Sequence, residues 1–183
     1  MKKAIFALII LFLGFSYAMP AATAEAAVNS GLSPNDGLIL TYSPSFTKPS
    51  KETFHVKKKE NFTYLYNKKS QHYPELANLV YIEDDIGFSA SVGHSDFVFV
   101  SMPYPLLKQG STFIQSDHFD DYKVLVENTA KTVKVKAGTF KNTVILKYPD
   151  GSRLYLAKGI GIIKSTNAAG KVTTELAAVK AGK

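Results

Sequence analysis

A histidine among three aspartates is the group of residues in this sequence whose types best suit a metal ion. His118 lies beside Asp117, Asp120 and Asp121 in the stretch SDHFDDY. Imidazole and carboxylate groups are ligands for hard and borderline cations. The stretch has neither the D-x-D-x-D-G spacing of a calcium loop nor the H-E-x-x-H spacing of a zinc helix, and aspartates are common in solvated turns. We therefore expect a turn here and no metal site.

Three consecutive acidic residues could supply the paired carboxylates that cleave glycosidic bonds. They are Glu83, Asp84 and Asp85. Because successive side chains of a strand point to opposite faces, such a pair would need a partner from another element. A charged turn is the interpretation that we prefer.

The stretch SVGHSD contains the residue types of a serine hydrolase triad, namely Ser91, His94, Ser95 and Asp96. It lacks the glycine-x-serine-x-glycine elbow, and the members of a triad converge from different elements rather than from one short stretch. The sequence also has no glycine-rich phosphate loop. It predicts no catalytic residues, no metal and no cofactor, and a hydrolase with an unrecognised site remains an alternative.

Two lysine clusters flank the aromatic stretch FTYLY. A hairpin around the sequence KKKEN would place these lysines near aromatic rings that share one strand face, so that they could contact a polyanion, a glycan or a partner protein. The alternative is that the lysines only keep an edge strand from pairing with other chains. The residues of this candidate contact are Lys57, Lys58, Lys59, Lys68, Lys69, Tyr64 and Tyr66.

The net charge is basic, and almost all of it comes from lysine. The chain has 22 Lys+Arg against 15 Asp+Glu, a formal net charge of +7, and Arg153 is its one arginine. Proteins that bind nucleic acid depend on arginine, whose guanidinium group donates two parallel hydrogen bonds to a phosphate or a base. With one arginine in the chain, a nucleic-acid partner is not expected. For an exported protein the available polyanions are cell-wall polymers and anionic lipids. The alternative, which we prefer, is that the charge only keeps the protein soluble.

The amino terminus has the three parts of a secretory signal peptide. Lys2 and Lys3 precede an apolar core at residues 4–15, and Ala24 and Ala26 fit the small-x-small cleavage pattern. The apolar run is shorter than the ~20 residues that span a bilayer. We expect a signal peptide at residues 1–26, cleaved after Ala26 or Ala24, and no membrane span after processing.

The sequence contains no cysteine, which excludes a lipid anchor, disulfides, thiolate metal sites and cysteine nucleophiles. The remaining chain has the length of one domain with a proper core. We expect a monomeric single domain at residues 27–183, of which residues 27–33 are disordered. It should be secreted or associated with the cell wall of a Gram-positive-like cell.

Short alternating apolar runs separated by turn residues predict a mostly β fold. The runs number roughly ten, a spacing typical of antiparallel sheets. We predict a meander that forms a curved sheet, a sandwich or a half-barrel. One short helix is expected at residues 74–79, and residues 96–101 (DFVFVS) should form a strand that is buried on both faces. The remaining expected strands are at residues 38–42, 54–57, 62–66, 79–82, 87–92, 122–127, 132–136, 144–148, 153–157, 162–166 and 172–179.

Several turns are expected within this meander. The stretch ENTAK should turn the chain between two strands, and Pro149, Asp150 and Gly151 have the types that a tight turn requires. Glycines 138, 159 and 161 are expected at turns or bends. These residues are scaffold.

Four fragments resemble a widespread group of bacterial secreted proteins and lipoproteins. The fragments are LSPNDGLILTY, PYPLLKQGSTF, VKVKAGTFKNTVIL and LYLAKGIGIIKS. The group opens with a proline-x-x-glycine entry, places an Ala-Gly-Thr-Phe hairpin and ends with a glycine-x-glycine strand. This chain departs from it by lacking the cysteine that carries the lipid and by having Phe113 where tryptophan is usual.

The resemblance implies a β-rich domain of the cell envelope, and it implies no catalytic residues. Together with the residues above, it favours a non-enzymatic binding or interaction protein of the envelope, whose partner would be an anionic cell-wall polymer or another envelope protein. An alternative is a small carrier that holds an apolar ligand or lipid in its curved sheet.

Overall fold

The computed structural model describes residues 31–67, 76–116 and 120–182. These residues form twelve antiparallel β-strands and one short 3-10 helix, so the predicted mostly β fold is confirmed. The bounds are β1 (Leu38–Tyr42), β2 (Glu52–Lys59), β3 (Phe62–Tyr66), β4 (Leu79–Glu83), β5 (Gly87–Val92), β6 (Val98–Pro103), η2 (Tyr104–Leu106), β7 (Thr112–Ser116), β8 (Asp121–Val135), β9 (Gly138–Lys147), β10 (Arg153–Ala157), β11 (Gly161–Thr166) and β12 (Val172–Ala181).

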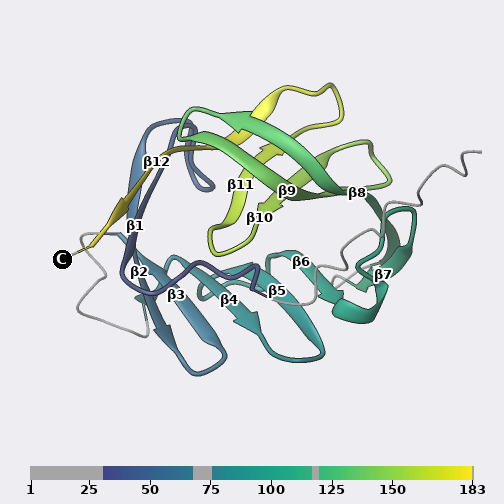
Figure 1. The fold of residues 1–183 in the computed structure, drawn as a ribbon, viewed down its shortest axis with the longest axis horizontal. Helices are drawn as coiled ribbons and strands as arrows, with labels where there is room; N and C mark the ends of the chain where they lie inside the picture. Colours follow the sequence, from purple (N-terminus) through teal and green to yellow (C-terminus); the bar gives the residue numbers. More distant parts are fainter. Residues whose placement is uncertain (1–30, 68–75, 117–119, 183) are drawn as a thin grey trace, which may run out of the picture.

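All twelve strands belong to one curved sheet. Its order is β6-β5-β4-β3-β2-β1-β12-β11-β10-β9-β8-β7. Two consecutive meanders, β1 to β6 and β7 to β12, are therefore joined where β1 pairs with β12. In Figure 1 the two meanders curve toward each other below and above, and give the sheet the shape of a nearly closed barrel.

Side chains bridge the two edges of the sheet, β6 and β7. The Gln115 amide oxygen accepts from the Ser101 amide at 3.2 Å, and its nitrogen donates to the Val98 carbonyl at 3.4 Å. The same nitrogen donates to the Tyr122 hydroxyl at 2.9 Å. The Tyr148 hydroxyl donates to the Phe99 carbonyl at 2.5 Å. Because an unpaired strand edge exposes a row of polar groups, these bonds take the place of part of a backbone ladder.

Alternate side chains of each strand fill the interior of the barrel, as the two-residue strand period requires. Burial of each such side chain contributes roughly 1.5–3 kcal/mol. Among the aromatic residues of the core, the hydroxyl of Tyr42 donates to the Ile162 carbonyl at 2.9 Å. Burial raises the pKa of both Tyr42 and Tyr81. Fully buried members of the core include Leu40, Phe54, Leu65, Val100, Val124, Val126, Val144, Leu146, Leu156, Ile162 and Leu176.

The segment before β1 packs into the structure. The sequence predicts disorder at residues 27–33, whereas Leu32 is fully buried and Ser33 is 4% exposed. The Glu83 carboxylate accepts from the backbone amides of Gly31, Leu32 and Ser33 at 2.5, 2.9 and 2.9 Å. The Tyr104 hydroxyl also donates to it. Residues 31–33 are thus held in place by the buried side chain of Leu32 and by the carboxylate of Glu83. The amino-acid composition of this segment does not predict these contacts, because Glu83 is distant in the sequence. Residues 1–30, with the expected signal peptide, lie outside the described residues.

The prediction of a turn at residues 127–131 (ENTAK) is wrong. Residues 121–135 form the single strand β8, whose pairing with β9 is interrupted by register shifts between Val126 and Val133. Asn128 accepts from the Ala130 amide at 2.9 Å within this irregular region. Polar residues of turn type therefore mark bulges here, where the strand bends without reversing.

Strand β6 also differs from its prediction. Its side chains alternate between exposed and buried instead of being buried on both faces, because only one face of the curved sheet packs into the core. Phe97, just before it, is 57% exposed. Only part of the helix expected at residues 74–79 is described: Leu76 lies in a 3-10 turn and Leu79 already begins β4.

The glycines expected at turns lie next to strand ends, and Gly138, Gly151, Gly159 and Gly161 all have positive φ. Gly161 is tightly enclosed, since a Cβ there would lie 2.9 Å from Cε1 of Tyr81. Within the described ranges, no helix is long and apolar enough to cross a bilayer.

Candidate ligand-binding pocket

A pocket of about 430 Å³ opens at one end of the barrel. It lies where the chain enters β6 and β8, beside the β9–β10 and β11–β12 turns, and we call it the mouth pocket. Its residues come from positions 96–99, 122, 148–154, 165–167 and 173. Distant parts of the sequence meet there because the meander brings their strand ends to the same side.

Four aromatic side chains line the mouth pocket. The rings of Phe97 and Phe99 have centroids 5.0 Å apart and an interplanar angle of 83°. Those of Tyr122 and Tyr148 are 6.2 Å apart at 51°. Aromatic pairs prefer such non-parallel arrangements because the negative face of one ring attracts the positive edge of another. The rings therefore present faces in several directions.

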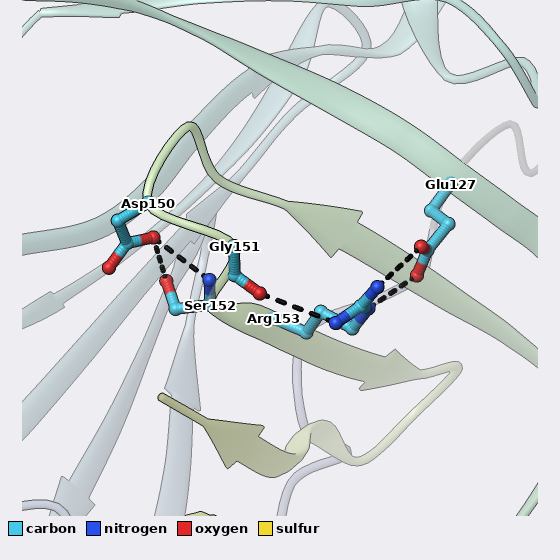
Figure 2. Close-up of polar contacts among 5 residues, drawn as sticks. All are labelled: Glu127, Asp150, Gly151, Ser152 and Arg153. Carbon is cyan, nitrogen blue, oxygen red and sulfur yellow. Dashed lines mark hydrogen bonds and ion pairs between the residues drawn. The ribbon is translucent and has the colours of Figure 1, made fainter. Parts of the chain in front are cut away.

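The one arginine of the chain, Arg153, lines the mouth pocket, and Figure 2 shows its polar contacts. Its Nε donates to Oε2 of Glu127 at 2.7 Å, and its Nη2 donates to Oε1 at 2.9 Å. Its Nη1 donates to the Gly151 carbonyl at 3.3 Å. The hydrogen bond from Arg153 holds the pKa of Glu127 below its usual range, and the same contact raises the pKa of Arg153. Both groups stay charged at neutral pH and neutralise each other.

Asp150 forms the other polar corner, in the turn between β9 and β10. Its Oδ1 accepts from the Ser152 amide at 2.9 Å and from the Ser152 hydroxyl at 2.7 Å, as Figure 2 shows. The Ser152 hydroxyl lowers the pKa of Asp150, and the Ser152 amide adds to this effect. Asp150 is therefore an ionised carboxylate that fixes the turn, with the opposite pKa shift from that of a general acid.

Two buried hydroxyl groups belong to the same wall. Thr166 is 6% exposed, and its Oγ1 has no hydrogen-bond partner. Burial raises the pKa of Tyr148, to which the neighbouring Tyr122 and Asp150 contribute. An unsatisfied buried hydroxyl is costly, so Thr166 is a strained point of this wall.

The carboxylates that suggested glycoside cleavage have structural contacts. Glu83 holds the amides of residues 31–33, and Asp84 Oδ1 accepts from the Ile86 and Gly87 amides at 2.9 and 3.0 Å. Asp85 is exposed in the same turn. The charged turn that we preferred is what the structure has at this position.

The residues of triad type do not converge. The Ser91 hydroxyl donates to the Val80 carbonyl at 3.4 Å. His94 is exposed in a turn with φ of 56°, and the Ser95 hydroxyl accepts from the Phe97 amide at 3.1 Å. Asp96, in contrast, lies at the mouth pocket.

The proposed metal cluster is only partly described, because Asp117 and His118 lie outside the described residues. Within residues 31–67, 76–116 and 120–182, no group of three or more histidine, aspartate and glutamate residues is placed to hold a metal ion.

The described residues of the candidate polyanion contact lie on β2 and β3. Lys57, Lys58 and Lys59 are exposed, and Lys57 and Lys59 lie opposite Tyr64 and Phe62. Phe62, Tyr64 and Tyr66 stack in a row with centroid separations of 5.9 and 6.0 Å. Tyr66 is 2% exposed. Lys68 and Lys69 lie outside the described residues.

A second hollow, of about 370 Å³, lies on the outer face of β4, β5 and β6 beside β7. Its exposed apolar residues are Ile82, Ile86 and Ile114, which are 37%, 74% and 54% exposed. Its one charged residue is Asp84, whose carboxylate is already used by its own turn. It offers fewer polar groups to a ligand than the mouth pocket does.

Comparisons with known proteins do not give this chain a family. No protein-family model matches it, and no curated protein matches it. One similar solved structure is a protein of Bacteroides fragilis NCTC 9343 that is designated an exported protein with a YmcC-like fold. It is 16% identical, with 82% of this chain and 99% of that chain covered and a TM-score of 0.43.

A second similar solved structure is a protein of Parabacteroides distasonis ATCC 8503 that is designated a lipoprotein. It is 10% identical, with 82% of this chain and 99% of that chain covered and a TM-score of 0.35. Identities and TM-scores this low assign neither a function nor a partner to this chain, and its site must be judged from its own residues.

Proposed function

We propose that this chain is an exported, non-enzymatic binding protein of the cell envelope or the extracellular space, and that the mouth pocket is its ligand site. The pocket carries the proposal, because its volume lies within the roughly 300–1,000 Å³ of small-molecule sites and it combines aromatic walls with a few polar groups. Export rests on the signal pattern of residues 1–26. The processed protein is a monomeric domain of residues 27–183.

The character of the pocket separates this proposal from its two alternatives. A lipid carrier needs an enclosed cavity without charge, whereas Asp96, Asp150 and Arg153 line the mouth pocket. A glycosidase needs a carboxylic acid whose pKa is raised, whereas the pKa of Asp150 is lowered. These observations favour a site that binds its ligand without reacting with it.

The test is equilibrium binding with a panel of neutral sugars, organic cations and organic anions, added to the purified exported protein. We expect a member of the panel to bind and Phe97→Ala to weaken that binding by about tenfold, or about 1.4 kcal/mol. Because Phe97 is 57% exposed, the variant should remain folded. Ile86→Ala, in the second hollow, is the matched control and should bind as the wild type does. If no probe binds, or if Phe97→Ala binds unchanged, the proposal is wrong.

A second contact surface is favoured by the stacked rings of β3 beside the lysines of β2. We propose that this lysine–aromatic face, Lys57 to Lys59 with Phe62 and Tyr64, contacts an anionic cell-wall polymer; Tyr66, which is 2% exposed, lies beneath the surface. Three exposed ammonium groups supply long-range attraction, and Phe62 and Tyr64, stacked 5.9 Å apart with an interplanar angle of 9°, form the flat surface.

Retention on purified cell wall tests this face. Replacing Lys57, Lys58 and Lys59 by glutamine should reduce retention at low salt, whereas the wild type should lose retention only as salt is added. A triple variant at Lys131, Lys134 and Lys141 removes the same charge from β8 and β9 and should be retained as the wild type is. An equal loss of retention in both triple variants would show that the net charge, and not this face, makes the contact, and equal retention of all three proteins would rule out both.

A further inference from the structure

The charges of the mouth pocket allow one further inference, which rests on the proposed function. The protein has a formal net charge of +7, yet the charged side chains that line the pocket are Asp96, Asp150 and Arg153. Glu127 already neutralises Arg153 through two hydrogen bonds. Asp150, whose hydrogen bonds are to Ser152, therefore gives the wall of the mouth pocket a negative charge on a basic protein.

The negative charge of this site is held in place. Ser152 donates two hydrogen bonds to Asp150 and lowers its pKa, so this carboxylate remains ionised at neutral pH. The neighbouring Tyr148 has a raised pKa because it is buried and because Tyr122 and Asp150 disfavour another negative charge there. The Asp150 carboxylate would repel an anionic ligand and attract a cation.

The aromatic rings suit a cation as well. The rings of Phe97 and Phe99 are nearly perpendicular, at 83°, and those of Tyr122 and Tyr148 are inclined at 51°. The face of an aromatic ring attracts a cation by ~0.5–2 kcal/mol, and sites built from several rings recognise quaternary ammonium groups. The four rings and the Asp150 carboxylate together favour a ligand with one positive charge and apolar groups around it.

We propose that the mouth pocket binds a small organic cation, such as a quaternary ammonium compound. The ammonium group lies beside Asp150, and its alkyl groups contact Phe97 and Tyr122. The pocket volume of about 430 Å³ leaves room for such a ligand.

The experiment compares choline with 3,3-dimethylbutan-1-ol, in which a carbon atom replaces the nitrogen and removes the charge without changing the shape. Isothermal titration of the purified exported protein should give choline at least about tenfold higher affinity, and added salt should reduce the difference. N-acetylglucosamine is titrated in parallel as a neutral sugar.

Asp150→Asn is the decisive variant, because an asparagine oxygen still accepts from the Ser152 amide and keeps the turn. It should lower choline affinity by about three- to tenfold and leave the neutral analogue unaffected. Asp84→Asn is the matched control, since Asp84 makes the same kind of turn with the Ile86 and Gly87 amides outside the mouth pocket. It should not change choline affinity. Phe97→Leu, which keeps the apolar bulk but removes the ring, should weaken the binding of choline more than the binding of its neutral analogue.

Equal affinity for choline and its neutral analogue would overturn the inference. So would binding of N-acetylglucosamine without binding of choline, provided that Phe97→Ala abolishes the sugar binding; in that case the proposed binding function stands and only the ligand class is wrong. If none of these compounds binds, and the wider panel also fails, the proposed function falls and the inference with it.

Discussion

Arg153 on β10 and Glu127 on β8 are joined by two hydrogen bonds of 2.7 and 2.9 Å across the intervening strand β9. The arrangement is the bidentate fork that arginine forms with a carboxylate and that lysine cannot reproduce. It places the chain's single arginine beside the mouth pocket while using its charge for the scaffold. The pair therefore adds no net charge to the wall of the mouth pocket.

This ion pair should make stability depend on pH. The pKa of Glu127 is lowered in the folded protein, so its contribution is present above the unfolded value of about 4.3 and is lost as the pH falls through the lower folded value. At pH 7 Glu127→Gln should lower the free energy of unfolding by up to ~1 kcal/mol, since both side chains are partly exposed. Urea unfolding at pH 7 and pH 3 checks this. A difference between variant and wild type that does not shrink at pH 3 would contradict it.

Gln115 should be essential to the contact between β6 and β7. In Gln115→Ala the Ser101 amide and the Val98 carbonyl lose the partner that they have in the folded protein, at a cost of roughly 0.5–1.5 kcal/mol for each hydrogen bond. Hydrogen exchange of the β6 and β7 amides should speed up more than that of β10. Gln109→Ala, at an exposed position, is the control and should change unfolding by less than ~0.5 kcal/mol.

The segment before β1 should be part of the cooperative fold. Leu32 is fully buried, so Leu32→Ala should lower the free energy of unfolding by ~2–5 kcal/mol. Leu106→Ala, at a leucine that is 41% exposed, should cost much less. If the two variants unfold at the same denaturant concentration, residues 31–33 do not pack as described.

Two glycines with nearly the same backbone conformation should differ in their tolerance of alanine. Gly161 and Gly110 have φ of 80° and 83°, so alanine costs ~1–2 kcal/mol of backbone strain at either position. Only at Gly161 would the added Cβ meet Tyr81, at 2.9 Å, and this crowding adds ~1–3 kcal/mol. The melting temperature of Gly161→Ala should therefore be well below that of Gly110→Ala. Equal melting temperatures would contradict the close contact with Tyr81.

The sequence predicted individual strands well where apolar residues alternate and turn residues flank them. The bounds of β1, β5 and β10 are those expected from residues 38–42, 87–92 and 153–157. β8 was expected as two strands because Asn128 and its neighbours have turn-forming types, and single-residue preferences do not distinguish a bulge from a reversal. β7 was not predicted as a strand, since its sequence TFIQS is short and follows a glycine- and proline-rich stretch.

The mouth pocket could not be predicted from the sequence. Phe97, Tyr122, Tyr148 and Thr166 lie far apart along the chain, and they meet only because the order of the sheet brings four strand ends together. A partial signal was present: Arg153 is the one arginine, and an arginine in a lysine-rich chain indicates a site where bidentate geometry is needed.

The most direct test of the proposed binding function is to map the amide chemical shifts of the exported protein while a ligand is added. With choline as the probe, we predict saturable shifts that cluster at residues 96–99, 122, 150–153 and 165–167, and that disappear in Phe97→Ala. Shifts that gather on β2 and β3 instead, or that rise linearly without saturation over the whole surface, would contradict a ligand site at the mouth of the barrel.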